Sequence, residues 1–172
     1  IPSTYNEKPV KEIGVGAFQY CSSLANITIG NGVASIGKDA FYNCKKLASI
    51  NIPNNVTSIG GSAFYGCSSL TSINIPDSVT SIGSSAFEGC DKLIKKVKGV
   101  SYIDKWVIDC DTSVTNVELK DDTVGIGGDA FRGCSSLTSI VIPESVTSIS
   151  EGAFIYCSSL TDITIPDSVT SI

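Results

Sequence analysis

Cysteine and phenylalanine recur at a fixed interval of 23 residues in two blocks of this 172-residue chain. A fixed period of about 20 to 50 residues is typical of solenoid proteins, in which each repeat forms one coil and contacts only its neighbours. The repeat constrains the fold more strongly than any local motif, because every coil must present the same apolar positions to the next. The periodic residues are Cys21, Cys44, Cys67, Cys90, Cys134 and Cys157, with Phe18, Phe41, Phe64, Phe87, Phe131 and Phe154.

The unit at 67–90 indicates how one coil folds. Ile73 and Ile75 alternate with polar residues, which predicts a short strand with one buried face. Pro76 ends this strand, because proline has no N–H group to donate. The segment 84–87 follows a glycine and predicts one brief helical turn. At the same offsets, parallel strands are expected at 24–29, 47–52, 70–75, 114–119, 137–142 and 160–165.

An irregular insert interrupts the array once, over about 91–110. Two turn signals divide it into three apolar runs, which predicts an antiparallel meander. The regular positions resume in phase before Cys134, so we expect a single domain over 1–172. The strands of the meander are expected at 94–97, 100–103 and 106–108.

The two ends of the sequence also deviate from the regular unit. The segment 3–9 is longer than the usual turn, and we expect it to bulge as a loop. The chain begins at Ile1-Pro2, which matches Ile75-Pro76, and it stops at Ile172 in the middle of a repeat. Both ends are therefore expected to be truncated.

The repeated text C-S-S-L-T-S-I-x-I-P-x-S-V-T-S-I-G-x-x-A-F occurs at 67–87 and again around 134–154. It resembles the BspA-like class of leucine-rich repeats, a 23-residue type also described in a treponemal leucine-rich protein. The resemblance covers the chain except for the insert at 91–110. It implies a leucine-rich-repeat solenoid, of the α/β class by convention, that forms a curved right-handed superhelix of short parallel strands and helical turns. The antiparallel meander is then its one insert.

Function is implied by the same resemblance. Similar proteins are surface-exposed or secreted proteins of anaerobic, host-associated bacteria, and they are associated with adhesion to host proteins or other cells. The chain is therefore expected to be extracellular or at the cell surface and to bind a host or bacterial surface protein. A structural spacer that holds another domain away from the cell surface is the alternative.

Composition disfavours several other functions. The net charge of −5 disfavours nucleic acid as a partner, because nucleic-acid binding needs clustered Lys and Arg. The one basic cluster, at 92–98, is better explained as a solvated strand edge. No apolar run reaches the ~18 residues that a membrane span needs. The absence of histidine removes the commonest general base, and no CxxC pair suits zinc, so no enzyme, cofactor or metal site is predicted.

The seven cysteines are expected to be free thiols. Cysteines one coil apart with parallel side chains would have Cβ atoms at least ~4.8 Å apart, beyond the ~3.5–4.5 Å that a disulfide requires. Buried thiols that pack as small apolar side chains explain the periodic six better. Cys110 lies off the period and is expected to be the most reactive.

Two sets of residues are candidates for contact with a partner. The outward positions of the strands form a small polar column, and Asn51, Asn74 and Glu118 belong to it. This column is either a solvated face that resists aggregation or a surface that docks a partner through many weak contacts. Tyr102 and Trp106 in the insert have the aromatic character of interface anchors. Their alternative role is to pack the meander on the solenoid.

Overall fold

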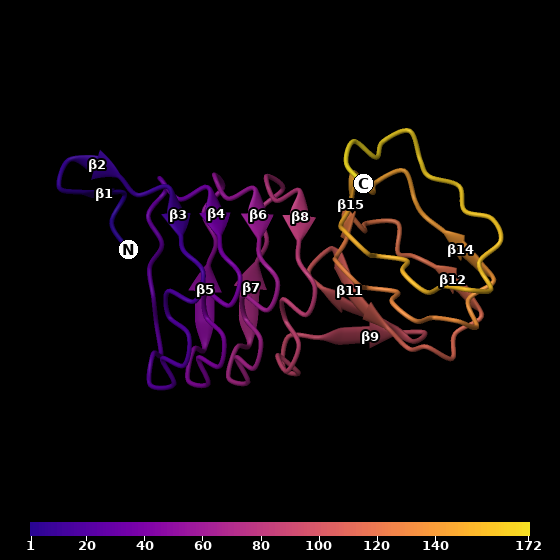
Figure 1. Cartoon of the computed structure of the whole chain (residues 1–172), viewed down its shortest axis with the longest axis horizontal. Coiled ribbons are helices and arrows are strands. Elements are labelled where there is room, and N and C mark those ends of the chain that lie inside the picture. The colour runs from indigo at the N-terminus through magenta and orange to yellow at the C-terminus, as the bar shows by residue number, and fades with distance from the viewer. The chain divides into compact units, whose positions relative to one another are not determined.

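The computed structural model describes residues 1–172, and it contains fifteen short strands and no helix (Figure 1). Two compact units, Ile1–Ile94 and Lys95–Ile172, make up the chain. The first unit contains β1 Thr4–Tyr5, β2 Lys8–Pro9, β3 Glu12–Ile13, β4 Ser35–Ile36, β5 Ser49–Asn51, β6 Ser58–Ile59, β7 Ser72–Asn74 and β8 Ser81–Ile82. The second contains β9 Lys95–Val97, β10 Val100–Ile103, β11 Trp106–Cys110, β12 Asn116–Glu118, β13 Gly125–Ile126, β14 Ser139–Val141 and β15 Ser148–Ile149.

Two parallel ladders hold the coils of the first unit together. Strands β3, β4, β6 and β8 form one sheet and β5 and β7 form the other, visible as the upper and lower rows in Figure 1. The register joins residues one repeat apart, as in Ile36↔Ile59 and Ile50↔Ile73. Because side chains alternate along a strand, each ladder buries a column of isoleucine and presents serine or asparagine outward. The solenoid fold predicted from the repeat is confirmed.

The expected strands are only partly correct. The predicted strands at 47–52, 70–75, 114–119 and 137–142 are present but have three residues each. No strand forms at 24–29 or 160–165. The ladder that contains β8 was not among the predicted strands, since two residues are too few to produce a visible alternation in the sequence.

The helical turn predicted at 84–87 is wrong. Ser85 has a φ of 55°, in the left-handed region, which stops a right-handed helix from propagating. The N–H of Ala86 donates locally to the carbonyl of Gly83, but its own carbonyl accepts from Phe64 in the preceding coil at 2.8 Å. Alternate peptide groups therefore bond between coils, and the turns add a third set of inter-coil hydrogen bonds to the two ladders.

The turns carry the phenylalanines into a continuous stack. In the first unit the rings of Phe18, Phe41, Phe64 and Phe87 lie nearly parallel, with successive centroids 5.2–5.3 Å apart. In the second unit Phe131 and Phe154 stack in the same way at 5.1 Å. Aromatic stacking adds to the free energy gained from burying these large side chains.

Most of the periodic cysteines donate a hydrogen bond to the carbonyl of a phenylalanine in the preceding coil. The Sγ of Cys67 donates to the carbonyl of Phe41 at 3.2 Å, and Cys90 donates to Phe64 at 3.1 Å. Desolvation raises the pKa of both thiols to about 12. Cys67 and Cys90 are thus protonated, poorly reactive thiols that also satisfy a backbone carbonyl.

All seven cysteines are free, but the prediction of which ones are accessible is wrong in part. Cys21 is exposed, because it lies in the first coil and no earlier coil covers it, and Cys157 is half-buried. Cys110, expected to be the most reactive, is buried, and its pKa is raised first by desolvation and then by Cys134. Thiolate is the reactive form, so a buried thiol with a raised pKa reacts slowly.

We expect one thiol of the native protein to react rapidly with a chromogenic disulfide reagent, and all seven to react after denaturation. The fast thiol is Cys21. The variant Cys21→Ser should lose the rapid phase, and the number of thiols that react after denaturation should fall by only one. Rapid labelling of Cys110 in the native protein, located by peptide mass spectrometry, would contradict this assignment.

We also expect the protein to lose stability in alkaline solution. An unfolded cysteine has a pKa of about 8.5, whereas the folded pKa values of Cys67 and Cys90 are about 12. The folded state therefore holds these protons more tightly, so the stabilisation is complete below about pH 8.5 and is lost as the pH rises towards 12. Melting temperatures recorded between pH 7 and 11 should fall, and the fall should be smaller in Cys67→Ala/Cys90→Ala. Equal slopes for the two proteins would count against this explanation.

The loop predicted at 3–9 is confirmed as an exposed β-hairpin. Strands β1 and β2 pair antiparallel, with Thr4↔Pro9 and Tyr5↔Lys8. Asn6 and Glu7 between them have φ values of 48° and 63°, which is typical of a two-residue hairpin turn of type I′. The hairpin projects from the first coil (Figure 1).

The second unit begins with the predicted antiparallel meander, which is confirmed. Strand β10 pairs antiparallel with both β9 and β11, and β11 then pairs parallel with β13. The five-stranded order is β15-β13-β11-β10-β9, and β12 and β14 form a separate parallel pair. The meander therefore supplies the first strand of a new ladder, and each ladder belongs to one unit alone. That residues 1–172 act as a single domain stays a prediction.

Candidate functional site

The sequence analysis assigned Asn51, Asn74 and Glu118 to the polar column on the outward side of the strands. Asn51 and Asn74 lie opposite each other on β5 and β7, and both are exposed. In the second unit Glu118 on β12 is exposed and lies opposite Val141 on β14, whose side chain is 61% exposed. Each unit therefore presents a narrow outward face, and the face of the second unit joins a carboxylate to an apolar side chain.

Hydrogen bonds between coils fix part of this column before any partner binds. Ser139 Oγ donates to Asn116 Oδ1 at 2.7 Å, and Thr138 Oγ1 donates to the carbonyl of Thr115 at 2.8 Å. Asn116 Nδ2 in turn donates to Thr115 Oγ1 at 3.2 Å. A face that is already ordered loses less conformational entropy on binding.

The two aromatic candidates in the insert are buried. Tyr102 and Trp106 are each only 2% exposed. A Cβ atom at Gly125 would lie 2.5 Å from the indole ring carbons of Trp106, so the indole lies directly on this glycine. Lys120 Nζ lies 4.2 Å from the centre of the Tyr102 ring, and burial raises the pKa of that tyrosine. These positions favour packing, the alternative role that the sequence left open.

The packing of Trp106 also accounts for the glycine at position 125. Gly125 pairs with Ser148 in the ladder, at a position where neighbouring coils carry serine. No side chain fits between the Gly125 backbone and the indole, so the repeat serine is replaced by glycine. The glycine at position 125 is thus explained by packing.

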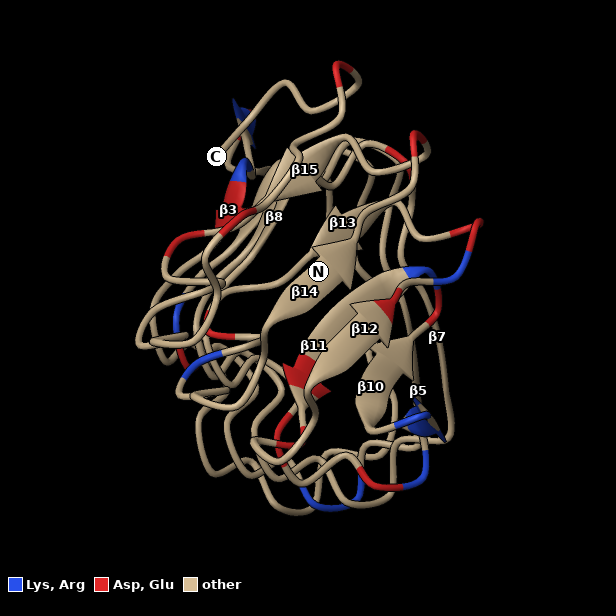
Figure 2. Cartoon of the chain, turned by 90° about the vertical axis from the view of Figure 1, so that its right-hand side faces the viewer, with Lys and Arg blue, Asp and Glu red and all other residues tan.

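The charged residues do not gather into a reactive cluster. Lys96 forms an ion pair with Asp111, and Arg132 forms one with Asp129; both pairs lie at the surface. No group of three or more His, Cys, Asp or Glu side chains is arranged to hold a metal ion. Lys95 and Lys96 lie on β9, the outer strand of its sheet, which confirms the interpretation of the basic cluster as a solvated strand edge. Figure 2 shows that much of the remaining charge lies on connecting loops.

The sequence analysis missed an aromatic cluster on the turns of the first unit. The rings of Tyr42 and Tyr65 stack with centroids 4.8 Å apart and planes 6° apart. Tyr20 packs edge-on against Tyr42 at 5.4 Å and is 64% exposed. We call Tyr20, Tyr42 and Tyr65 the tyrosine stack. Its sequence signal was a tyrosine one or two residues after the periodic phenylalanine in three consecutive coils.

The chain forms no helix that could cross a membrane. The arrangement is thus a set of ordered, exposed side chains on a scaffold of buried columns. It offers hydrogen-bond donors and acceptors, scattered charges and a few exposed aromatic rings, all of which suit noncovalent contact with another molecule.

The family model described as BspA type leucine rich repeat region matches residues 3–107 and 103–172, with six copies. The chain is similar to a leucine rich cell surface protein from Faecalibacterium prausnitzii A2-165, with 34% sequence identity, 99% of this chain and 42% of that chain covered, and a TM-score of 0.50. A leucine-rich repeat protein from Bacteroides ovatus is also 34% identical, with 98% and 39% covered and a TM-score of 0.54. A leucine-rich repeat protein from T. pallidum is 27% identical, with 94% and 77% covered and a TM-score of 0.50.

A search of curated proteins finds no significant match. The chain spans only 42% and 39% of the first two structures. The descriptions of these three proteins name repeat or cell-surface proteins and no enzyme. The family model covers almost every residue, and the strand register reproduces the 23-residue repeat on which the resemblance was based. The chain belongs to the BspA-type leucine-rich-repeat family.

Proposed function

We propose that the chain is a non-enzymatic protein-binding module of a bacterial cell-surface or secreted protein, and that it contributes to adhesion. The main support is the exposed strand column, whose outward residues are held in register by parallel strand pairing in both units and are partly ordered by side-chain hydrogen bonds in the second unit. Family membership adds that repeats of this kind occur in a described cell surface protein. The proposed partner is a protein of the host or of another bacterial surface.

Asn51, Asn74 and Glu118 are the proposed contact residues of the column. All three are exposed, and the ladders beneath them hold their backbones in register. Each such polar contact is weak in water, at about 0.5–1.5 kcal/mol, so affinity must come from several coils acting together. A rigid array meets this need, because one backbone arrangement serves every coil.

The second candidate function is a spacer. Stacked coils with mutual hydrogen bonds can hold a neighbouring domain at a distance without recognising any partner. The two functions differ in one measurable property: a spacer retains no specific protein, whereas a binding module retains at least one.

The test is a pull-down from host and bacterial surface extracts with the whole chain immobilised. We expect a specific protein to be retained, and Asn51→Lys/Asn74→Lys to reduce its retention at least tenfold. The matched control is Asn54→Lys/Asn55→Lys, which adds the same charge on an exposed turn of the same unit. Retention of nothing beyond the background of an unrelated solenoid would favour the spacer. Equal loss in both variants would place the contact outside the column.

A further inference from the structure

We propose that Cys110 and Cys134 of the second unit form a disulfide when the chain folds in the presence of a small-molecule disulfide such as oxidised glutathione. The structure shows the reduced protein, in which all seven cysteines are free. The inference goes beyond the proposed function, because the bridge needs no protein partner. It is related to that function only through location, since disulfides persist in the oxidising environment outside the cell.

Cys134 lacks the hydrogen-bond partner that the periodic cysteines have in other coils. Four of these cysteines donate to the carbonyl of the phenylalanine 26 residues earlier, at 3.1–3.2 Å, namely Cys44, Cys67, Cys90 and Cys157. The residue 26 positions before Cys134 is Ile108, which lies in strand β11 of the meander. The Sγ of Cys134 instead lies 3.9 Å from the carbonyl oxygens of Cys110 and Asp111. Its thiol is therefore directed at the chain around Cys110.

The two sulfur atoms converge on one backbone carbonyl. Cys110 Sγ lies 3.7 Å from the carbonyl oxygen of Asp111, the same oxygen that Cys134 Sγ approaches at 3.9 Å. Desolvation raises the pKa of Cys110, and the charge of Cys134 and a hydrogen bond between the two thiols raise it further. Thiols in such contact need only a small side-chain rotation to reach the S–S distance of about 2.0 Å in a disulfide.

The phase of Cys110 in the repeat removes the constraint that excludes disulfides elsewhere in the chain. Cysteines 23 residues apart have parallel side chains, whose Cβ atoms are at least ~4.8 Å apart and too distant to bridge. Cys110 precedes Cys134 by 24 residues and is the last residue of β11, which pairs antiparallel with β10. Its side chain is therefore not bound to the direction of the periodic column. Cys67 and Cys90, which are in phase, each direct the thiol to a phenylalanine carbonyl instead.

The bridge would join the end of the meander to the regular coil that follows it. Both cysteines are buried in one apolar core, at 5% and 0% exposure. The loop between them contains β12 and its exposed Glu118, a proposed contact residue of the strand column. Closing this loop removes conformational freedom from the unfolded chain and so favours the folded state. We therefore expect the bridged protein to melt about 5–10 °C higher than the reduced one.

The bridge forms by two steps of thiol–disulfide exchange. One cysteine thiolate attacks a sulfur of oxidised glutathione, so that one glutathione leaves and a mixed disulfide remains on the protein. The other cysteine thiolate then attacks the protein sulfur of that mixed disulfide and releases the second glutathione. The protein loses two electrons and two protons, and the two glutathione molecules leave as thiols. Because both cysteines are buried and their pKa values are raised in the folded state, the exchange takes place while the chain folds.

The test is oxidative refolding of the whole chain. The parent protein is the variant Cys21→Ser, because the exposed thiol of Cys21 would also react with glutathione. It is refolded from urea either with oxidised glutathione in excess or in reductant. The oxidised sample should be lighter by about 2 Da, the mass of two hydrogen atoms. After denaturation it should titrate with two thiols fewer than the reduced sample.

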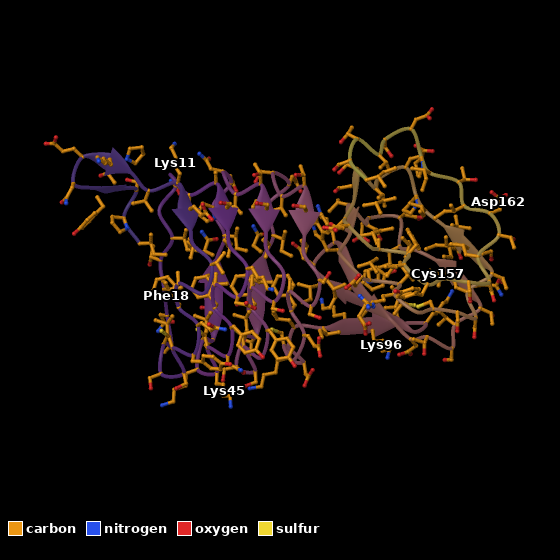
Figure 3. All side chains as sticks on the ribbon, viewed as in Figure 1. Lys11, Phe18, Lys45, Lys96, Cys157 and Asp162 are labelled. Atoms are coloured by element: carbon orange, nitrogen blue, oxygen red, sulfur yellow. The ribbon has the colours of Figure 1, made fainter.

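Peptide mass spectrometry without reduction identifies the bridged pair. Trypsin combined with a glutamyl endopeptidase separates Cys134 from Cys157, because Glu144 lies between them. This separation is needed because Cys157 also belongs to the second unit (Figure 3). We expect a linked pair of peptides that contain Cys110 and Cys134.

Variants of the parent protein test whether both cysteines are needed. Addition of Cys110→Ser or of Cys134→Ser should abolish the mass loss and make the melting temperature equal in the two buffers. The matched control is the addition of Cys67→Ser, which removes a buried cysteine of the first unit and should leave the bridge intact. Circular dichroism verifies that each variant has folded, and the peptide map of the parent protein decides the assignment even where a serine variant does not fold.

The proposal is overturned if oxidative refolding leaves every thiol of the parent protein free, or if the bridge joins Cys134 to Cys157 or any pair of the first unit. A bridge at the expected pair that leaves the melting temperature unchanged would overturn its stabilising role. The pull-down tests a separate claim. If the bridge forms but no specific protein is retained, the proposed function fails and the disulfide stands.

Discussion

Replacement of Phe64 by alanine is expected to lower the free energy of unfolding by about 3–5 kcal/mol. Phe64 is fully buried, and its ring stacks on Phe41 on one side and on Phe87 on the other, each at 5.3 Å. The alanine variant loses the transfer free energy of the ring and both stacking contacts, and it leaves a cavity between coils that hydrogen bonds hold at a fixed distance. Urea unfolding followed by circular dichroism measures the change.

Phe18→Ala is the matched control in the same column. Phe18 is only half-buried and stacks on one side, against Phe41. Its replacement should cost clearly less than that of Phe64. Equal losses at the two positions would indicate that the stack does not set the stability of the first unit.

Replacement of Trp106 in the second unit by alanine should lower the free energy of unfolding by a similar amount, about 3–5 kcal/mol. The indole is 2% exposed and lies against the backbone of Gly125. Gly125→Ser adds a side chain on the other side of the same contact and restores the serine of the repeat. It is nevertheless expected to lower the free energy of unfolding by about 1–3 kcal/mol, because the serine Cβ would overlap the indole.

The double variant Trp106→Ala/Gly125→Ser tests whether these two effects share one contact. Once the indole is removed the serine fits, so the double variant should be more stable than the sum of the single losses predicts, by about 0.5–3 kcal/mol. Gly14→Ala is the control, since no atom lies within 4 Å of a Cβ placed there. Additive losses, or a large effect at Gly14, would rule out the proposed contact.

The sequence predicted the coils well because the period itself is a physical constraint. Ile73 and Ile75 had to face inward in register with the coils on either side, and a slip of one residue would have turned them outward. The insert was also correctly located, since its turn residues Lys98 and Asp104 have φ values of 49° and 52° between strands that pair antiparallel.

The turns could not be predicted in the same way. A short run such as 84–87 has the composition of a helical turn, and only the next coil reveals that alternate peptide groups bond outward. The left-handed φ of Ser85 depends on that partner coil and not on any preference of serine.

The prediction of partner-binding residues depended on the solvent exposure of their side chains, which the residue type alone does not give. Trp106 has the chemical character of an interface anchor, yet it fills space over a glycine that lies 19 positions later in the sequence. Tyr42 and Tyr65 were indistinguishable in sequence from buried ring positions, because each follows a buried phenylalanine. Both are half-buried on turns whose geometry the sequence analysis misassigned.

The central claim is that exposed side chains recognise a protein while the buried insert only supports the fold. Site-specific photo-cross-linking in the presence of the protein retained in the pull-down tests it most directly, with the photoreactive residue placed at Asn74 in one sample and at Trp106 in another. We expect a cross-linked complex from position 74 and none from position 106, with both proteins folded by circular dichroism. A complex formed from position 106 and not from position 74 would contradict the account.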